Sequence, residues 1–512
     1  MPRPSTPLAA PSVAAALAAD RLGVPAVVFF VMSAATPLTV VAGVVTTGYA
    51  TTGLIGIPVA FLAVAAVLAL FSVGYVAMAR RVANAGAFYS YIARGVGRPA
   101  GVGAAWVALA SYNLLQVGLY GAIGAAVAPL LDQWTGVDVV WWLIALVAWA
   151  VTATMGLARV DVNGRVLSVL LLAEVAIIVV YSLTSLAHPA DGKWNVAALS
   201  PSNLAGPGVG ALLVLAVLGF IGFEAAVVFA EETRDPKRTV ATATFIAVGV
   251  TAALYTLSSW AMTVAVGPEH IVDRSASEGP DLLFDSAGAH LGATMATAGR
   301  VLFATSILAA MIAFHNTTAR YMFALGRERV LPATLARTTL RGGTPLHASL
   351  LQSGIGLTAI IGYASVGSDP LVHLFYWAGT SGGIGILLLI TTTAIAVPLF
   401  LARQPPGAPR DSLWRRLVAP LIALAALLII TTLAVGNIDV LLGIAPGHRL
   451  TWAVPVGFLA IGAAGTGWGW WLRAHRPEVY AVIGLGAHAA VPPPAVPRTV
   501  AHDAGLRAGA RR

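Results

Sequence analysis

Long runs of apolar residues, separated by short polar stretches, extend along almost the whole chain. No charged residue occurs between Arg21 and Arg80, and at roughly 20 residues per crossing this segment is long enough for two membrane helices. Similar runs follow, and together they predict an all-α membrane protein with twelve transmembrane helices. The predicted spans cover residues 25–48, 56–79, 100–130, 139–158, 166–187, 208–231, 239–266, 298–319, 348–366, 371–401, 416–436 and 451–472.

The positive charges indicate how these spans are oriented. An even number of spans places both termini on one side of the membrane. Of the 30 Lys and Arg residues, only Lys193, Arg274 and Arg449 lie in loops of one face and Arg300 lies at the mouth of a span, which leaves 26 on the other face. Without the eight in the tails, that face still holds 18. Because loops rich in Lys and Arg stay in the cytoplasm, we expect a multi-pass protein of the cytoplasmic membrane with cytoplasmic termini.

Composition narrows the class of protein. Hydrophobic residues make up 58% of the 512 residues and charged residues 10%, a balance typical of polytopic membrane proteins. The net charge of +9 follows from the cytoplasmic loops, so it does not indicate a nucleic-acid partner. No cysteine is present, which excludes disulfides and thiolate metal sites. No HExxH motif, intramembrane Asp pair or P-loop occurs, so we expect neither an enzyme, nor a metal or organic cofactor, nor direct ATP drive within this chain.

Two of the predicted spans are interrupted. In the first span, within "SAATPLTVVAG", Pro37 cannot donate the backbone hydrogen bond of a continuous helix, but it suits the first turn of a new one. With Thr36 as its N-cap, we expect one helix to end near Ser33 and another to begin at Pro37. The sixth span contains "VLGFIGFEAAVVFAEE", in which Gly219 and Gly222 interrupt a bulky apolar run. Interrupted spans at corresponding positions indicate a transporter built from inverted repeats.

The spacing of the two interruptions predicts how the chain is divided. The first and sixth spans lie five apart, so spans 1 to 5 form one repeat and spans 6 to 10 its inverted copy. The start of the chain lacks the short apolar core of a signal peptide, and its end is rich in Pro, Ala and Arg. We expect a cytoplasmic tail at 1–22, repeats at 23–187 and 188–401, two further spans within 402–473, and a disordered cytoplasmic tail at 474–512.

Five segments resemble, in order and spacing, the amino acid/polyamine/organocation (APC) superfamily of secondary transporters. They are "SAATPLTVVAG", "RRVANAGAFYSYIARGVGRP", "GFIGFEAAVVFAEETRDPKRT", "ARYMFALGRERVLP" and "RPEVYAVIG". The resemblance runs from about Leu22 to Gly484. It implies the LeuT-like fold, which is a 5+5 inverted-repeat core with unwound helices 1 and 6 around a central substrate site, and here two additional helices.

The first break supplies the leading candidates for substrate binding. A helix start at membrane depth presents unpaired N–H groups that suit an anion. Many amino acid permeases of the superfamily hold the substrate's α-carboxylate at a Gly-Ser-Gly turn, but the matching residues here are Ala35, Thr36 and Pro37, and the proline removes one donor. A Thr-Pro pair is instead similar to putrescine importers of the superfamily. The candidate residues of this span are Ala34, Ala35, Thr36, Pro37 and Leu38.

The second break adds carbonyl acceptors and a carboxyl group. Beside Gly222, the freed carbonyls of Phe220 and Ile221 are candidate acceptors for a substrate ammonium. Glu224 follows in apolar surroundings, where an ionisable residue is a functional candidate by default. It could accept a proton, cap the second half-helix or face the substrate amine. Some relatives carry an aromatic residue that gates the site at a nearby position, and the residue at that position in this chain is Leu218.

Two other spans carry candidate substrate contacts. Tyr112, Gln116 and Tyr120 form a polar stripe at every fourth position of the third span, which interhelical hydrogen bonding explains equally well. In the tenth span, Trp377 follows Tyr376, and the pair suits either a gate at the substrate site or an aromatic belt.

A charged cluster is predicted at the cytoplasmic ends of the sixth and eighth spans. Three arginines follow the eighth span and four charged residues follow the sixth. We expect them to anchor this face, and they are candidates for a gate. They are Arg320, Arg327 and Arg329, with Glu231, Glu232, Arg234 and Asp235.

Glu174 of the fifth span is the candidate site for the coupling ion. It matches the position where some proton-coupled relatives carry a buried lysine, and burial of a carboxyl group favours its protonated form. We therefore expect H⁺ as the coupling ion, with Glu174 and Glu224 as candidate proton sites. A permanently protonated glutamate is one alternative. Sodium is the other, because Thr305 and Ser306 resemble the hydroxyl pair that binds it in relatives.

The function that follows is import of a small amine-containing solute, an amino acid or a polyamine, by a secondary active permease. The alternatives are an exchanger, a sodium-coupled symporter and, in another class, a transporter-like nutrient sensor. The expected partners are the solute and the lipid bilayer, with the chain present as a monomer or homodimer.

Overall fold

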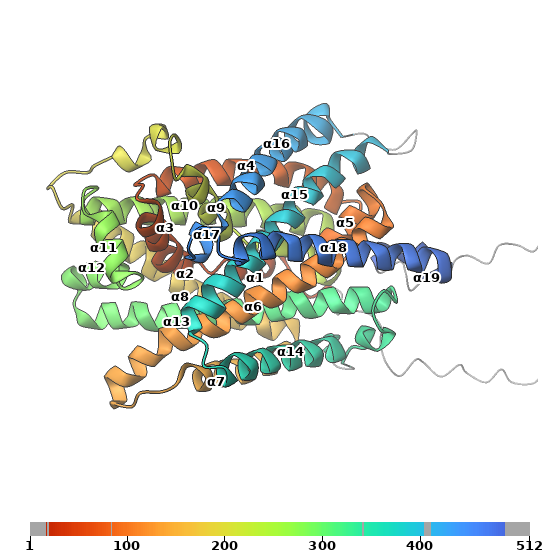
Figure 1. Ribbon diagram of the computed structural model, residues 1–512, viewed down its shortest axis with the longest axis horizontal. Coiled ribbons are helices and arrows are strands. Elements are labelled where there is room, and N and C mark those ends of the chain that lie inside the picture. Colours follow the sequence, from red (N-terminus) through yellow and green to blue (C-terminus); the bar gives the residue numbers. More distant parts are fainter. Residues whose placement is uncertain (1–16, 18–19, 83, 340–341, 404–410, 487–512) are drawn as a thin grey trace, which may run out of the picture.

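The computed structural model describes residues 17, 20–82, 84–339, 342–403 and 411–486, so most of the two predicted tails lies outside the described residues. In this part of the chain the regular structure is helical, and β pairing is limited to isolated bridges at Leu22–Thr233 and Thr338–Pro345. Figure 1 shows the long helices crossing between two opposite faces. One face carries α5 (Ala87–Gly95) and α19 (Pro477–Val482), and is called here the terminal face. The opposite, outer face carries α11 (Ile271–Glu278) and α12 (Asp281–Leu291).

Ten helical segments among the described residues are long and apolar enough to cross a membrane, which confirms an all-helical membrane protein. Six are single helices: α4 (Ile57–Ala79), α6 (Arg98–Thr135), α8 (Val160–Ala187), α10 (Pro236–Val266), α13 (Ala293–Arg327) and α18 (Leu450–His475). The other four are composite: Val24–Thr52, Val209–Val227, Pro370–Ala402 and Trp414–Gly436. Helices also occupy the two remaining predicted positions, but α7 (Trp141–Leu157) has only 17 residues and α14 (Leu346–Ser365) is less apolar.

The first span breaks at one residue. Helix α1 (Val24–Ala35) ends and α2 (Pro37–Thr39) begins on either side of Thr36, whose backbone is left-handed at φ 46° and ψ 63°. Pro37 lies in the first helical turn, as predicted, but α1 continues two residues past Ser33, and the Thr36 hydroxyl makes no capping hydrogen bond. The span continues as a π-helix, η1 (Val40–Val44), and then α3 (Val45–Thr52).

The sixth span is broken over a longer stretch. Helix α9 (Val209–Gly219) ends before a turn at residues 220–222, and the chain resumes as two short 3₁₀ segments, η4 (Phe223–Val227) and η5 (Ala230–Glu232). Gly222 has φ 115°, a backbone conformation that favours glycine. A Cβ atom there would lie 2.8 Å from the Ala34 Cβ, so the glycine also lets the two interrupted spans approach closely.

Several elements were not predicted by the apolar pattern. The tenth span opens as a π-helix, η7 (Pro370–Gly379), before α15 (Thr380–Ala402), and the eleventh opens with η8 (Trp414–Val418) before α16 (Ala419–Gly436). The tail predicted to be disordered from residue 474 instead continues α18 to His475 and then forms α19. The remaining short helices lie in loops: η2 (Ala197–Leu199), η3 (Pro201–Leu204), η6 (Ala333–Ala336) and α17 (Ile438–Leu442).

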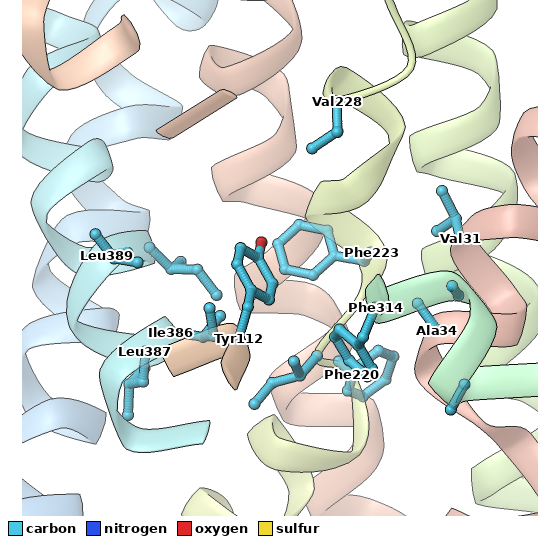
Figure 2. Close-up of a cluster of buried hydrophobic side chains, with 14 of the residues drawn as sticks. Val31, Ala34, Tyr112, Phe220, Phe223, Val228, Phe314, Ile386, Leu387 and Leu389 are labelled. Atoms are coloured by element: carbon cyan, nitrogen blue, oxygen red, sulfur yellow. The ribbon is translucent and has the colours of Figure 1, made fainter. Parts of the chain in front are cut away.

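The third span, α6, lies in the middle of the helix packing and contacts α13, α15, α18 and η7. Helix α1 packs against α8, α10 and α13, so both halves of the chain surround the first break. Figure 2 shows the buried side chains near that point, with Ala34 of α1, Phe314 of α13 and Tyr112 of α6. The rings of Tyr112 and Phe314 have centroids 6.0 Å apart.

Candidate functional site

A cavity of about 130 Å³ lies where the two interrupted spans meet α6, α13 and the tenth span. It is called here the central cavity. Its lining residues are Ala34, Ala35, Thr36, Thr39, Val40, Gly43, Val44, Thr47, Leu115, Gly118, Leu119, Leu215, Leu218, Ile221, Phe314, Phe375, Tyr376, Gly379, Thr380, Gly383 and Leu441. The walls are therefore mostly apolar, with threonine hydroxyls and broken-helix backbone as the polar groups.

The backbone groups freed by the first break are largely occupied. The Thr36 N–H donates to the Ser33 carbonyl at 3.3 Å, and the Tyr255 hydroxyl donates to the Ala35 carbonyl at 2.9 Å. The Leu38 N–H, which is the first free amide after Pro37, donates to Oε1 of Glu174 at 2.5 Å. A helix start attracts an anion through its unpaired amides and dipole. Here the protein's own carboxyl group occupies that position.

Glu174 is connected to the cavity wall by hydroxyl groups. Its side chain is buried, and Oε1 accepts a second hydrogen bond from Ser306 Oγ at 2.6 Å. Ser306 Oγ in turn accepts from Thr39 Oγ1 at 3.1 Å, and Thr39 lines the central cavity. A chain of two hydroxyls thus links the cavity to the carboxyl group. Thr305 lies apart from this chain, because its hydroxyl donates to the Leu302 carbonyl and it lines a separate apolar groove of α6, α7 and α13.

Glu224 is held inside the second break. Its side chain is fully buried, Oε2 accepts from the Gly222 N–H at 2.9 Å, and Oε1 accepts from the Tyr112 hydroxyl at 3.1 Å. The Tyr75 hydroxyl donates to the Glu224 backbone carbonyl at 3.1 Å. Of the three roles considered, this geometry matches the capping of the broken helix, and Glu224 does not line the central cavity.

The predicted substrate contacts divide into two groups. Ala34, Ala35, Thr36 and Ile221 line the central cavity. The other candidates do not line it: Pro37, Leu38, Tyr112, Gln116, Phe220, Gly222, Glu224 and Trp377. The Phe220 carbonyl accepts from the Phe223 N–H at 3.2 Å, and the buried Gln116 amide has no hydrogen-bond partner among the described residues. Trp377 lines a different groove, beside Phe458 of α18.

Three further cavity positions of the first span share a regular spacing in the sequence that could have identified them. Thr39, Gly43 and Thr47 recur at every fourth residue, which places them on one helical face, and all three line the central cavity. In the tenth span Phe375 and Tyr376, one or two positions before Trp377, line the cavity, as do Gly379, Thr380 and Gly383. The π-helix η7 changes which side chains face inward, and an α-helical pattern does not predict that change.

The central cavity continues toward the outer face. A second cavity, of about 510 Å³, shares Thr39, Gly43, Thr47, Phe375 and Tyr376 with the first and reaches α12. It is called here the outer vestibule. At its rim Arg300 is paired with Asp281 at 2.8 Å and with Asp285 at 2.6 Å. These ion pairs are partly exposed, so they contribute little energy.

Buried ion pairs join the sixth and eighth spans at the terminal face. Arg320 donates from Nε and a terminal nitrogen to the Glu232 carboxylate at 2.5 and 3.0 Å, and both side chains are 1% exposed. Arg327 makes two bonds to Glu231, each 2.7 Å long. These four residues of the predicted charged cluster thus lie together in two ion pairs. Of its other members, Asp235 caps α10 through the Arg238 N–H, and Arg329 is exposed.

The segment after α19 docks beside these pairs. Glu328, which is buried, accepts from the backbone N–H groups of Gly484 and Gly486, each at 2.7 Å, and from the Asn84 side-chain amide at 3.2 Å. Burial raises the pKa of Glu328, against the opposing effect of these hydrogen bonds. Arg94 Nε donates to the Gly484 carbonyl at 3.0 Å. The end of the described chain is therefore an integral part of the terminal face.

Two interrupted spans around a solute-sized cavity that continues toward one face define a helical membrane transport protein. The chain belongs to the amino acid permease family, which matches residues 22–462. This family lies in the APC superfamily and consists of transporters rather than enzymes.

The chain is also similar to individual transporters. It is 24% identical over 320 residues to the low-affinity putrescine importer PlaP of Escherichia coli strain K12, a match that covers 59% of this chain and 67% of that protein. It is 25% identical over 254 residues to the branched-chain amino acid permease BcaP of Bacillus subtilis strain 168, covering 48% and 49%. It is 22% identical over 243 residues to the methylthioribose transporter of the same organism, covering 48% of each chain. The chain thus spans about half the length of the last two relatives.

Proposed function

We propose that this permease imports a small amine-containing solute, an amino acid or a polyamine, across the cytoplasmic membrane by alternating access coupled to protons. The observation that carries the proposal is the chain of hydroxyls from the central cavity to Glu174, because it joins the candidate solute site to a buried carboxyl group. The names of the relatives, which include a putrescine importer and an amino acid permease, support the solute class.

The proposed architecture has twelve transmembrane helices and cytoplasmic termini. The repeats at 23–187 and 188–401 are related by inversion, so that α1–α3 in the first correspond to α9–η5 in the second. Support comes from the matching interruptions in the first span of each repeat and from the excess of Lys and Arg on the terminal face. The central cavity then opens outward, and the ion pairs of Arg320 and Arg327 close the cytoplasmic path.

Proton coupling is tested with Glu174→Gln in proteoliposomes that carry an imposed pH gradient. Glutamine keeps an oxygen acceptor for Leu38 and Ser306 but cannot exchange a proton. We expect gradient-driven accumulation of labelled solute to be lost, while exchange of solute across the membrane remains. The matched control is Glu278→Gln, which removes a carboxylate from an ion pair at the outer face. Unchanged concentrative uptake by Glu174→Gln would refute the proton site.

The sodium-coupled alternative has less support. A cation site needs several converging oxygens, and Thr305 points away from the Ser306–Glu174 pair. Uptake driven by a sodium gradient at constant pH would nevertheless favour it. Solute binding without any uptake or exchange would favour the nutrient sensor instead.

A further inference from the structure

None of the described residues that line the central cavity has a charged side chain. Among the described residues its polar lining consists of the hydroxyl groups of Thr36, Thr39, Thr47 and Thr380, the Tyr376 side chain and backbone groups. Any charge on a bound solute must therefore be met by neutral dipoles.

The nearest carboxyl groups are turned away from the cavity and already have partners. Glu174 accepts from the Leu38 N–H and Ser306, and Glu224 accepts from the Gly222 N–H and Tyr112. Neither residue lines the cavity. The same contacts occupy the Leu38 and Gly222 amides at the helix breaks, so a lone anion finds neither of these donors free. A lone cation finds no carboxylate among the described lining residues.

These contacts discriminate between classes of solute. A diamine carries two like charges at its ends, and burial of an unpaired charge in apolar surroundings is strongly unfavourable. An α-amino acid carries opposite charges on adjacent groups, which partly compensate each other, and an apolar side chain gains from burial. At roughly 10–15 Å³ for each water-sized group, the cavity of about 130 Å³ holds on the order of ten such groups.

We propose that the solute of this cavity carries no net positive charge and presents an apolar group to the wall formed by Leu115, Leu119, Leu215 and Leu218. This inference rests on the proposed function, because it concerns the same cavity. It distinguishes the chain from its putrescine-importing relative, although both are similar over much of their length.

Gly43 sets the size of solute that can enter. It lines both the central cavity and the outer vestibule, as Phe375 and Tyr376 do, and a Cβ atom added there would meet nothing within 4 Å. A larger side chain at Gly43 can therefore extend into the opening without displacing the backbone. At Gly383, by contrast, a Cβ would lie 2.6 Å from Leu218, so that glycine is needed for packing.

The charge preference is tested on the full-length purified protein by competition against labelled leucine, with putrescine and lysine as competitors. We expect leucine to bind at least tenfold more tightly than either cation. Equal or tighter binding of putrescine or lysine, or no binding of leucine, would overturn the inference. Leucine binding without uptake into liposomes would refute the transport proposal alone, whereas accumulation of putrescine would refute the inference alone.

Two variants test the residues that carry the preference. Leu218→Glu adds a carboxylate to the wall and should raise the affinity for putrescine relative to leucine at least tenfold, whereas Leu218→Gln should not. Gly43→Leu should weaken leucine binding at least tenfold while alanine binding changes less than threefold. Its control is Gly249→Leu, at another glycine with open space but away from the cavity. Unchanged preferences in both Leu218→Glu and Gly43→Leu, at the parent melting temperature, would contradict the assignment.

Discussion

Substitution of Glu232 by Gln should open the terminal face. Arg320 and Glu232 are each 1% exposed and joined by bonds of 2.5 and 3.0 Å, with the guanidinium 4.7 Å above the Phe229 ring. Removal of one partner leaves the other charge buried and uncompensated, which costs about 3–5 kcal/mol. If the pair separates when this face opens and Arg320 becomes hydrated, only the closed state bears that cost. The ratio of open to closed molecules then rises by a factor of roughly 10² to 4 × 10³, at about 1.4 kcal/mol per factor of ten.

Cysteine accessibility measures this change directly, because the chain contains no cysteine. Ala230, next to the ion pair and 2% exposed, is replaced by Cys as the only thiol. We expect a membrane-impermeant maleimide, applied to the terminal face, to alkylate it far faster in the Glu232→Gln background.

The control substitution is Glu278→Gln. It removes a partly exposed partner of Arg274 in an i,i+4 pair, and such pairs contribute at most about 1 kcal/mol. The alkylation rate should be the same as with Ala230→Cys alone. An equally unchanged rate with Glu232→Gln, in protein that keeps its melting temperature, would refute the idea that the buried pair holds this face closed.

Three further predictions concern the first break and the docked end of the chain. Thr36→Val and Thr36→Gly should both weaken solute binding, because each removes a cavity hydroxyl. Only the glycine variant should stabilise the protein, by about 1 kcal/mol, since the backbone φ is 46° at this position. Unaltered affinity in both variants would mean that the break is only a kink. Gly486→Ala should speed proteolysis after α19, because φ is 62° and a Cβ would lie 2.8 Å from the Asn84 Cγ. Because burial raises the pKa of Glu328 above 4.5, the folded protein should become less stable to unfolding as the pH rises through that raised value. A Glu328→Gln variant should lose this part of the pH dependence, and an unchanged pH profile of the melting temperature in that variant would contradict this.

Much of the fold follows from one-dimensional properties of the chain. Apolar runs of membrane length predicted the spans, because the bilayer requires about 20 apolar residues per crossing. The structure has a helix at each predicted span. Pro37 revealed the first break because proline cannot continue a helix. Gly219 and Gly222 revealed the second, and the structure shows a positive φ at Gly222. Each of these signals depends on a residue and its immediate neighbours.

The candidate site could be predicted only in part. Thr36 and Ile221 lie at breaks that the sequence locates, and both line the cavity. Trp377 lines a neighbouring groove, whereas Phe375 and Tyr376 just before it line the cavity. This part of the span is the π-helix η7, whose side chains do not follow an α-helical pattern. Helix α19 was missed because its six residues are too few to show a helical pattern, and the position of the segment after it depends on Glu328 and Arg94 of distant segments.

The stretch "SAATPLTVVAG" predicts the position of a helix break but not the partners of the backbone groups that the break frees. Its residues show that a helix must stop and restart at Pro37, since that requirement comes from the covalent structure of proline. They do not show that the restarting helix would meet Glu174, which lies 136 residues away in the chain and accepts from Leu38. Whether a freed amide is available to a solute or is already bonded depends on which side chains the packing of helices brings to it. The sequence therefore established a broken-helix membrane protein, whereas the partners of the freed backbone groups, and with them the character of the cavity, came from packing between segments far apart in the chain.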